Sequence, residues 1–176
     1  MSEKYMFFNS TDQDEREYSA ADMADFISGV CSNGVLDGLN VTLNNNDVVV
    51  SAGKAVINGY VYVLDENMSL PVDVLGVTRY DRVVIKLDSV QRQIHLDVKT
   101  GTDMTVPELT QNNEIFEISL AVLTVQANTT VVTGITTDAE YVWDYRKLKE
   151  TPILYGTSEP SSRKGNDGDI YIQYEE

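Results

Sequence analysis

Hydrophobic residues follow two different periods along this chain, and the first is helical. Large apolar residues after Ser19 recur with helical spacing, at Met23, Phe26, Ile27 and Val30. Ser19 can cap the first turn and Asp22 can complete a capping box, while Asn33-Gly34 is typical of a left-handed helix stop. The pattern predicts an amphipathic helix whose apolar face covers one face or end of a β-structured core.

From Val41 to Ile135 the period changes to two residues, which is typical of half-buried strands. We expect Val83–Asp88 and Ile94–Lys99 to pair antiparallel with one solvated face. A long strand is expected at Glu114–Gln126, buried on both faces, with Phe116, Ile118, Leu120 and Val122 on one of them. Asn58-Gly59 interrupts another strand, Ala55–Val63, as a hairpin turn or a bulge. Shorter strands are expected at Val41–Leu43, Val48–Val50 and Val131–Ile135. The expected core residues of one sheet are Val83, Ile85, Leu87, Ile94, Leu96, Ile118 and Leu120.

The two ends of the chain lack the regular two-residue period of this middle part. Residues 1–18 predict an extended arm and a charged loop, and Thr137 or Asp138 can begin a brief helix. Two short strands, Ile153–Tyr155 and Asp169–Tyr174, flank a linker that contains Pro160 and Gly165. Two isolated strands bury little surface, so we expect them to pair with another subunit or with the body of the domain.

The fold class expected from these patterns is mainly β, an antiparallel sandwich or barrel-like domain with one N-terminal helix and a C-terminal β extension. The expected divisions are an arm and helix at 1–40, the β domain at 41–149 and the extension at 150–176.

Composition and charge exclude several classes of function. The 176 residues are 42% hydrophobic and 23% charged, as in globular proteins, and carry a formal net charge of −15 with a pI near 4.3. Such a charge repels nucleic acid phosphates and anionic membranes, so no nucleic-acid partner is expected. The apolar runs are too short or interrupted for membrane insertion, and the acidic N-terminus is unlike a signal peptide. Synthesis in a cytoplasm is therefore expected.

Candidate catalytic and metal-binding residues have simpler structural interpretations. His95 lies on the expected solvated face of a strand without a nucleophile elbow, and pairs such as Asp81 and Asp88 or Asp65 and Glu66 occur by chance among 28 acids. Cys31, the single cysteine, is expected to be a buried thiol on the helix. The turn Asn166–Asp169 is rich in oxygen ligands for calcium, but lacks the distal glutamate of an EF-hand. The glycines Gly53 and Gly59 lack the Lys-Ser or Lys-Thr of a phosphate-binding loop. We expect no cofactor, no metal and no catalytic residue.

Tyrosine is abundant, with ten residues, and tyrosine suits both subunit interfaces and stacking against sugars. Tyr60 and Tyr62 share one face of a strand. Packing between subunits is the favoured interpretation and glycan contact the alternative. The interface candidates are Tyr60, Tyr62, Tyr155, Ile170, Tyr171, Ile172 and Tyr174.

The stretch from Ser51 to Thr102 resembles a pattern found in tail and baseplate proteins of tailed bacteriophages. Its parts are a Gly-Lys-Ala and Ile-Asn-Gly-Tyr hairpin, the run Arg-Tyr-Asp-Arg-Val-Val-Ile-Lys-Leu-Asp, a second strand and a Gly-Thr turn. The segment from Tyr155 to Tyr174, with Gly-Thr-Ser-Glu-Pro and Gly-Asn-Asp-Gly-Asp-Ile-Tyr-Ile, resembles a C-terminal motif of many phage tail proteins.

The resemblance implies a non-enzymatic virion protein of a tailed phage or phage-like particle, in the tail tip, baseplate or fibre. Other tail or baseplate proteins would be its partners. Relatives of the receptor-binding type often continue into a larger host-binding domain, which favours an adaptor or a short fibre here. The tyrosine content and the small tail favour a homo-oligomer, with a trimer as the expected state. A module that binds a host surface glycan and a glycan-cleaving enzyme remain the alternatives.

Overall fold

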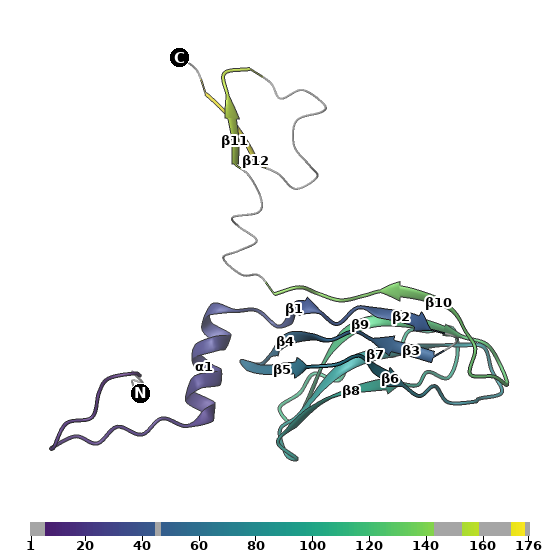
Figure 1. Cartoon of the computed structure of the whole chain (residues 1–176), viewed down its shortest axis with the longest axis horizontal. Coiled ribbons are helices and arrows are strands. Elements are labelled where there is room, and N and C mark those ends of the chain that lie inside the picture. The colour runs from purple at the N-terminus through teal and green to yellow at the C-terminus, as the bar shows by residue number, and fades with distance from the viewer. Residues whose placement is uncertain (1–5, 45–46, 143–152, 159–169, 175–176) are drawn as a thin grey trace. The chain divides into compact units, whose positions relative to one another are not determined.

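The computed structural model describes residues 6–44, 47–142, 153–158 and 170–174. The chain divides into two compact units, Met1–Val142 and Trp143–Glu176. The first unit is mainly β, and its strands form antiparallel sheets with one helix, α1 (Ala20–Val30), among the described residues (Figure 1). This confirms the expected fold class.

The first layer of the β-structure consists of two three-stranded sheets placed end to end. The strands β1 (Gly34–Gly38), β4 (Gly53–Ile57) and β5 (Tyr60–Leu64) form one sheet in the order β1-β4-β5. The strands β2 (Val41–Asn44), β3 (Asp47–Val50) and β6 (Met68–Leu70) continue it in the order β2-β3-β6. Backbone hydrogen bonds from Leu39 to Ala52 and from Ser51 to Asn40 join the two sheets. The β-structure thus begins at Gly34, before the expected residue 41.

The second layer is a four-stranded antiparallel sheet in the order β10-β9-β7-β8. Its strands are β7 (Arg79–Asp88), β8 (Gln93–Lys99), β9 (Ile115–Val125) and β10 (Val132–Thr137). Strands β8 and β9 lie on opposite sides of β7 and are both antiparallel to it, so they are parallel to each other. The connection between them must therefore return along the length of the sheet. Thr110 in this connection donates its backbone N–H to Glu117 at 2.6 Å, and Lys99 donates to the same carboxylate at 2.7 Å. Burial alone would raise the pKa of Glu117, but these hydrogen bonds and the Lys99 charge hold it below 4.5.

The core lies between the two layers, as in a β-sandwich. One cluster of buried apolar residues contains members of both, including Val48, Val50 and Ile57 from the first layer and Ile85 and Leu123 from the second. The expected core residues on β7, β8 and β9 belong to this cluster, with Ile94 half-buried against it. The predicted antiparallel pairing of β7 with β8 is confirmed, and it runs from Arg82 opposite Lys99 to Asp88 opposite Gln93.

A bulge changes the predicted facing of β9. Val83 pairs with Ala121 and Val84 with Ser119, so Leu120 is the extra residue. Beyond the bulge the core-facing positions shift by one, and Leu123 and Val125 join Ile118 and Leu120 in the core. The expectation that Val122 shares the face of Phe116 and Ile118 is wrong for this reason.

The first layer is closed along its β1 edge by the chain that follows β10. Val35 on β1 donates its N–H to the Glu140 carbonyl at 2.8 Å and accepts from Val142 at 2.9 Å, forming a parallel bridge with Tyr141. Gly34 is required here, because a Cβ at this position would lie 2.6 Å from the Glu140 oxygen. Residues 138–142 are therefore extended, and the rest of the expected brief helix lies outside the described residues.

The helix α1 begins as predicted and ends differently. Ser19 accepts from the Asp22 backbone while the Asp22 carboxylate accepts from the Ser19 backbone, which completes the capping box. The helix ends at Val30, and Cys31 is extended with a φ of −130°. The left-handed stop at Asn33-Gly34 is therefore wrong, since Gly34 begins β1. Cys31 is half-buried beyond the helix rather than buried on it.

The second unit contains a pair of short strands, β11 (Ile153–Gly156) and β12 (Ile170–Gln173). They pair with one another in parallel, from Ile153 opposite Ile170 to Gly156 opposite Gln173. The two strands lie at the predicted positions. They pair with each other, whereas pairing with another subunit or with the body of the domain was expected. The turn Asn166–Asp169 lies outside the described residues.

A buried ion pair lies on the core-facing side of β7. The side chains of Arg79 and Asp81 are 0% exposed, and Arg79 Nε donates to Asp81 Oδ1 at 2.8 Å. Asp81 also accepts from the Gly101 N–H at 2.9 Å, and Arg79 donates to the Asp73 carbonyl at 2.7 Å. The pair therefore ties the segment before β7 and the segment after β8 to the start of β7.

Replacing Leu87 or Leu120 by alanine should lower the free energy of unfolding by about 2–5 kcal/mol, because each buried side chain would leave a cavity. Urea unfolding measures the change, and Val90→Ala is the control because Val90 is 66% exposed on the β7–β8 turn. Unfolding midpoints equal to that of the wild type would contradict the core described above.

Replacing Asp81 by asparagine should lower the free energy of unfolding by about 3–5 kcal/mol, because the Arg79 charge would stay buried without a counterion. The matched control is Asp97→Asn, since the Asp97 side chain is 47% exposed and lies 3.9 Å from Lys86. A surface pair of this kind contributes at most about 1 kcal/mol. Equal losses in the two variants would show that burial of the Arg79–Asp81 pair has no special role.

Candidate functional site

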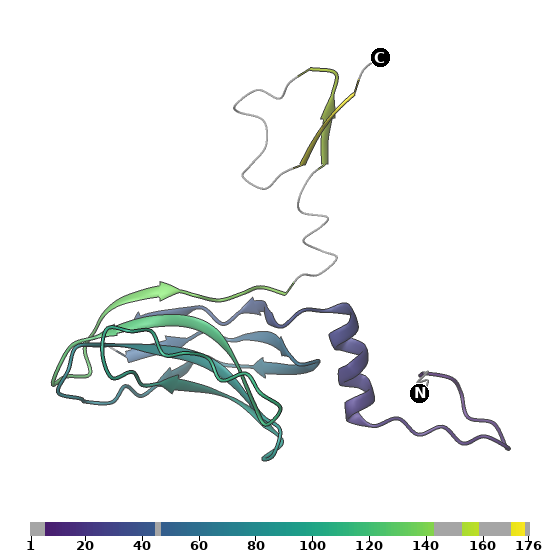
Figure 2. The same cartoon turned by 180° about the vertical axis from the view of Figure 1, so that it is seen from behind.

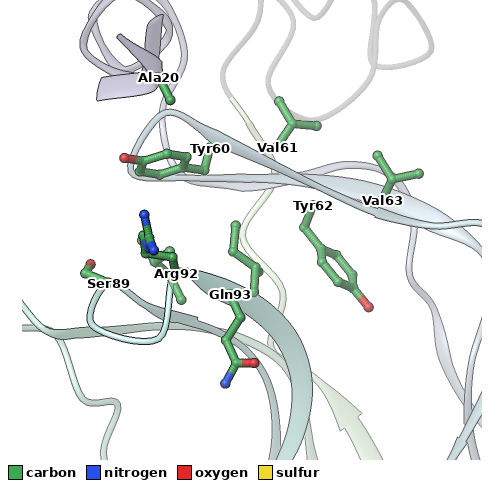
Figure 3. A pocket seen from close by; sticks show the side chains of 10 residues that line it. Ala20, Tyr60, Val61, Tyr62, Val63, Ser89, Arg92 and Gln93 are labelled. Atoms are coloured by element: carbon green, nitrogen blue, oxygen red, sulfur yellow. The ribbon is translucent and has the colours of Figure 1, made fainter. Parts of the chain in front are cut away.

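A cavity of about 520 Å³ lies between β5 and the turn that joins β7 to β8. Strand β5 is the edge of the first layer and β8 is the edge of the second, so the cavity occupies the side of the sandwich opposite the Val35–Tyr141 bridge. Figure 3 shows its walls. The lining residues are Ala20, Tyr60, Val61, Tyr62, Val63, Leu87, Ser89, Arg92, Gln93 and Ile94.

The side chains of β5 alternate between the two faces of their sheet. Tyr60 and Tyr62 lie on one side of the strand, while Val61 and Val63 point to the other side (Figure 3). Tyr62 packs against the core, and its burial raises the pKa of its hydroxyl above 10.0. Tyr60 is 39% exposed. The prediction that these tyrosines share one face of a strand is confirmed.

The opposite wall of the cavity is mixed in character. Arg92 lies in the turn with a φ of 54°, and Gln93 is the first residue of β8 (Figure 3). Leu87 and Ile94 add apolar surface to the lining. None of the lining residues is Asp, Glu or His. The cavity therefore offers aromatic and apolar contact with a few hydrogen-bond donors, which suits an uncharged polar ligand or a side chain from a partner.

A second candidate surface is the apolar stripe of α1, which we define as Met23, Phe26 and Val30. These side chains are 49%, 46% and 62% exposed, whereas Ala24 is the buried residue of the helix. Ala24 contacts the end of the β4–β5 hairpin so closely that a Cβ at Gly59 would overlap the Ala24 carbonyl. The helix therefore meets one end of the β-structure, as Figure 2 also shows, with Ala24 as its buried residue.

The arm before α1 adds aromatic residues near this stripe. The ring of Phe7 lies 5.1 Å from that of Phe26 and 5.3 Å from that of Tyr18. Phe7 and Phe8 are 46% and 62% exposed. The exposed apolar surface of the N-terminal part thus extends from the stripe of α1 onto the arm.

The tail candidates lie in the second unit. Tyr171 is half-buried and donates to the Ser158 carbonyl at 2.6 Å, whereas Ile172 and Tyr174 are 51% and 47% exposed. Tyr155 and Ile170 belong to β11 and β12, where only their backbones are described.

The other candidate residues take structural positions in the described part of the chain. His95 is half-buried on β8 opposite Lys86, and Asp81 is engaged in the buried ion pair. Asp88 accepts from the Val90 and Gln91 backbones and so stabilises the β7–β8 turn. Residues 6–44, 47–142, 153–158 and 170–174 contain no group of three His, Cys, Asp or Glu that could hold a metal ion.

Reasoning from the sequence missed the second wall of the cavity and the buried ion pair. No sequence pattern predicted that Arg92 and Gln93 line a cavity, because their position depends on how the two layers pack. Arg79 and Asp81 could have been found from the sequence. They precede Val83 and Ile85 at two-residue spacing, and residues at this spacing lie on the same, core-facing side of a strand.

Neither the comparison with protein-family models nor the comparison with curated proteins gives a match for this chain. Within the described ranges, no helix has both the length and the apolar character needed to cross a membrane.

Proposed function

We propose that this chain is a non-enzymatic structural protein of a tailed phage or phage-like particle, which acts in the tail tip, baseplate or fibre as an assembly or attachment component. The resemblance of the motifs in Ser51–Thr102 and Tyr155–Tyr174 to those of phage tail proteins supports the assignment to such a particle. The exposed apolar stripe of α1 is the single observation that carries the assembly role.

The stripe is better explained by a partner than by packing within the chain. A helix in a globular domain normally turns its large apolar residues toward the core. In α1 the small residue Ala24 takes that place and Phe26 stays 46% exposed. Exposed apolar patches of this kind mark sites of protein association.

The charge distribution fits association at the same place. The whole chain carries −15, yet residues 26–36, which include the end of the stripe, contain no charged residue. Repulsion between acidic proteins is smallest where charge is absent. The partners are copies of the chain, with a trimer as the proposed state, and other tail or baseplate proteins.

Replacing Phe26 by glutamate should lower the oligomeric mass, because a charge in the stripe opposes its burial. Light scattering should give three times 19.6 kDa for the wild type and a smaller mass for Phe26→Glu. The matched control is Ala21→Glu, which adds the same charge at an exposed position on the opposite side of α1. A monomeric wild type would contradict the proposal, as would equal masses for the two variants.

Binding of an uncharged host glycan is the second candidate function, and the cavity beside Tyr60 favours it. An exposed tyrosine ring next to donors such as Arg92 and Gln93 is suited to stacking on a sugar and hydrogen bonding to its hydroxyls. Binding of a host glycan would be one way for the chain to act in attachment.

Replacing Tyr60 by alanine should weaken binding of neutral cell-wall fragments by about tenfold or more if the cavity holds a glycan, since the stacking surface is lost. Isothermal titration calorimetry measures the affinity. Tyr174→Ala is the control because Tyr174 is similarly exposed but lies in the second unit. Absence of binding by the wild-type chain would leave assembly as the function of this surface.

A further inference from the structure

Strand β5 has an unpaired edge whose orientation follows from the adjacent hairpin. Ile57 and Tyr60 flank the two-residue turn Asn58-Gly59, whose φ values are 47° and 77°. In such a hairpin the flanking residues exchange hydrogen bonds, and every second pair after them does the same. Val61 and Val63 are the alternate residues, so their backbone N–H and C=O groups point away from β4.

These backbone groups have no partner within the described part of the chain. No hydrogen bond joins Val61 or Val63 to any described segment beyond β4, and both side chains are about half exposed, at 50% and 47%. The edge therefore combines free hydrogen-bonding groups with exposed apolar side chains.

Three other edges of the sandwich, those of β1, β8 and β10, carry features that oppose strand addition, and β5 does not. The β1 edge is covered by residues 140–142, β8 carries Asp97 and Lys99, and β10 contains an irregular register at Val132. Strand β5, Tyr-Val-Tyr-Val-Leu, has neither a charged residue nor a proline, and its pairing with β4 is regular. Proteins normally protect an edge of this type.

We propose that the β5 edge pairs with β5 of a second copy of this chain, antiparallel and about a two-fold axis at Tyr62. This inference rests on the proposed assembly role and names the partner and the contact. In this register Val61 of each copy lies opposite Val63 of the other, and the two pairs exchange four backbone hydrogen bonds. The valines meet on the outer face and the two Tyr62 rings on the cavity face, which creates one six-stranded layer.

Charge favours a copy of the same chain in this register. Two chains that each carry −15 repel one another, but residues 55–64 contain no charged residue. Asp65 lies opposite Gly59 of the second copy, so no two carboxylates face each other across the axis. The edge is self-complementary, as a two-fold interface requires.

The size of the contact defines its strength. A five-residue strand is about 17 Å long, so pairing along β5 alone buries less than the roughly 1,200 Å² of a stable interface. We therefore expect the β5 contact to form a weak, concentration-dependent dimer when α1 association is absent, and to join two trimers when α1 contacts hold each trimer together.

The test uses the full-length chain with Val61→Pro, which removes a donor that is unused in the monomer. Association measured by sedimentation velocity over a range of concentrations should weaken about tenfold to hundredfold, because two of four hydrogen bonds are lost. The control Val61→Thr keeps the N–H and should associate nearly as the wild type does. If Val61→Pro lowers the melting temperature, Val63→Lys serves instead, since it places a charge on the edge at an exposed position.

Amide hydrogen exchange identifies the contact directly. The Val61 and Val63 amides of the wild type should become protected as concentration rises and should exchange rapidly in dilute protein. Protection that is already present in the dilute monomer would overturn the inference, because a segment of the same chain would then cover the edge. Equal association of Val61→Pro and Val61→Thr would overturn it as well. Association lost in Phe26→Glu but unchanged in Val61→Pro would support the α1 contact and reject the β5 contact, so the two proposals fail separately.

Discussion

The buried ion pair of Arg79 and Asp81 constrains how the sandwich closes. Both side chains are fully buried on the core-facing side of β7, where an uncompensated charge would cost several kcal/mol. Asp81 also needs the Gly101 N–H and Arg79 needs the Asp73 carbonyl. The segments before β7 and after β8 must therefore reach this point together. The central strand of the second layer is thus held in one position relative to both connections.

One side of the sandwich is covered by another segment of the chain and the other side is open. The candidate surfaces lie on the open side. On one side the chain after β10 pairs with Val35 and closes the β1 edge. On the other side β5 remains unpaired, and a cavity opens between it and the β7–β8 turn. The helix α1 is attached to the same hairpin, through Ala24 against Gly59 and through hydrogen bonds between Asn33 and Asn58. The apolar stripe, the cavity and the free edge therefore belong to one end and one side of the first unit.

Local features of the sequence predicted much of this fold correctly. Ser19 and Asp22 predicted the start of α1 because a capping box needs only neighbouring residues. Asn58-Gly59 marked the β4–β5 hairpin because both residues tolerate positive φ, although a bulge was an equal alternative. The alternation along β7 and β8 predicted their pairing, since opposite faces of a strand repeat every two residues. The spacing of Tyr60 and Tyr62 likewise predicted that they share one face of a strand.

By itself, the sequence determined which residues share a face in β5, β7 and β8, where α1 begins and which turn joins β4 to β5. Only the tertiary structure decided which of those faces are covered. The stripe of α1 has a core-like pattern, yet Met23 and Val30 are exposed because the helix approaches Gly59 closely through Ala24 instead. The bulge at Leu120 and the bridge from Val35 to Tyr141 join residues far apart in the chain. Periodicity describes one element at a time, whereas burial depends on the elements that meet it, and that is the physical reason for the division.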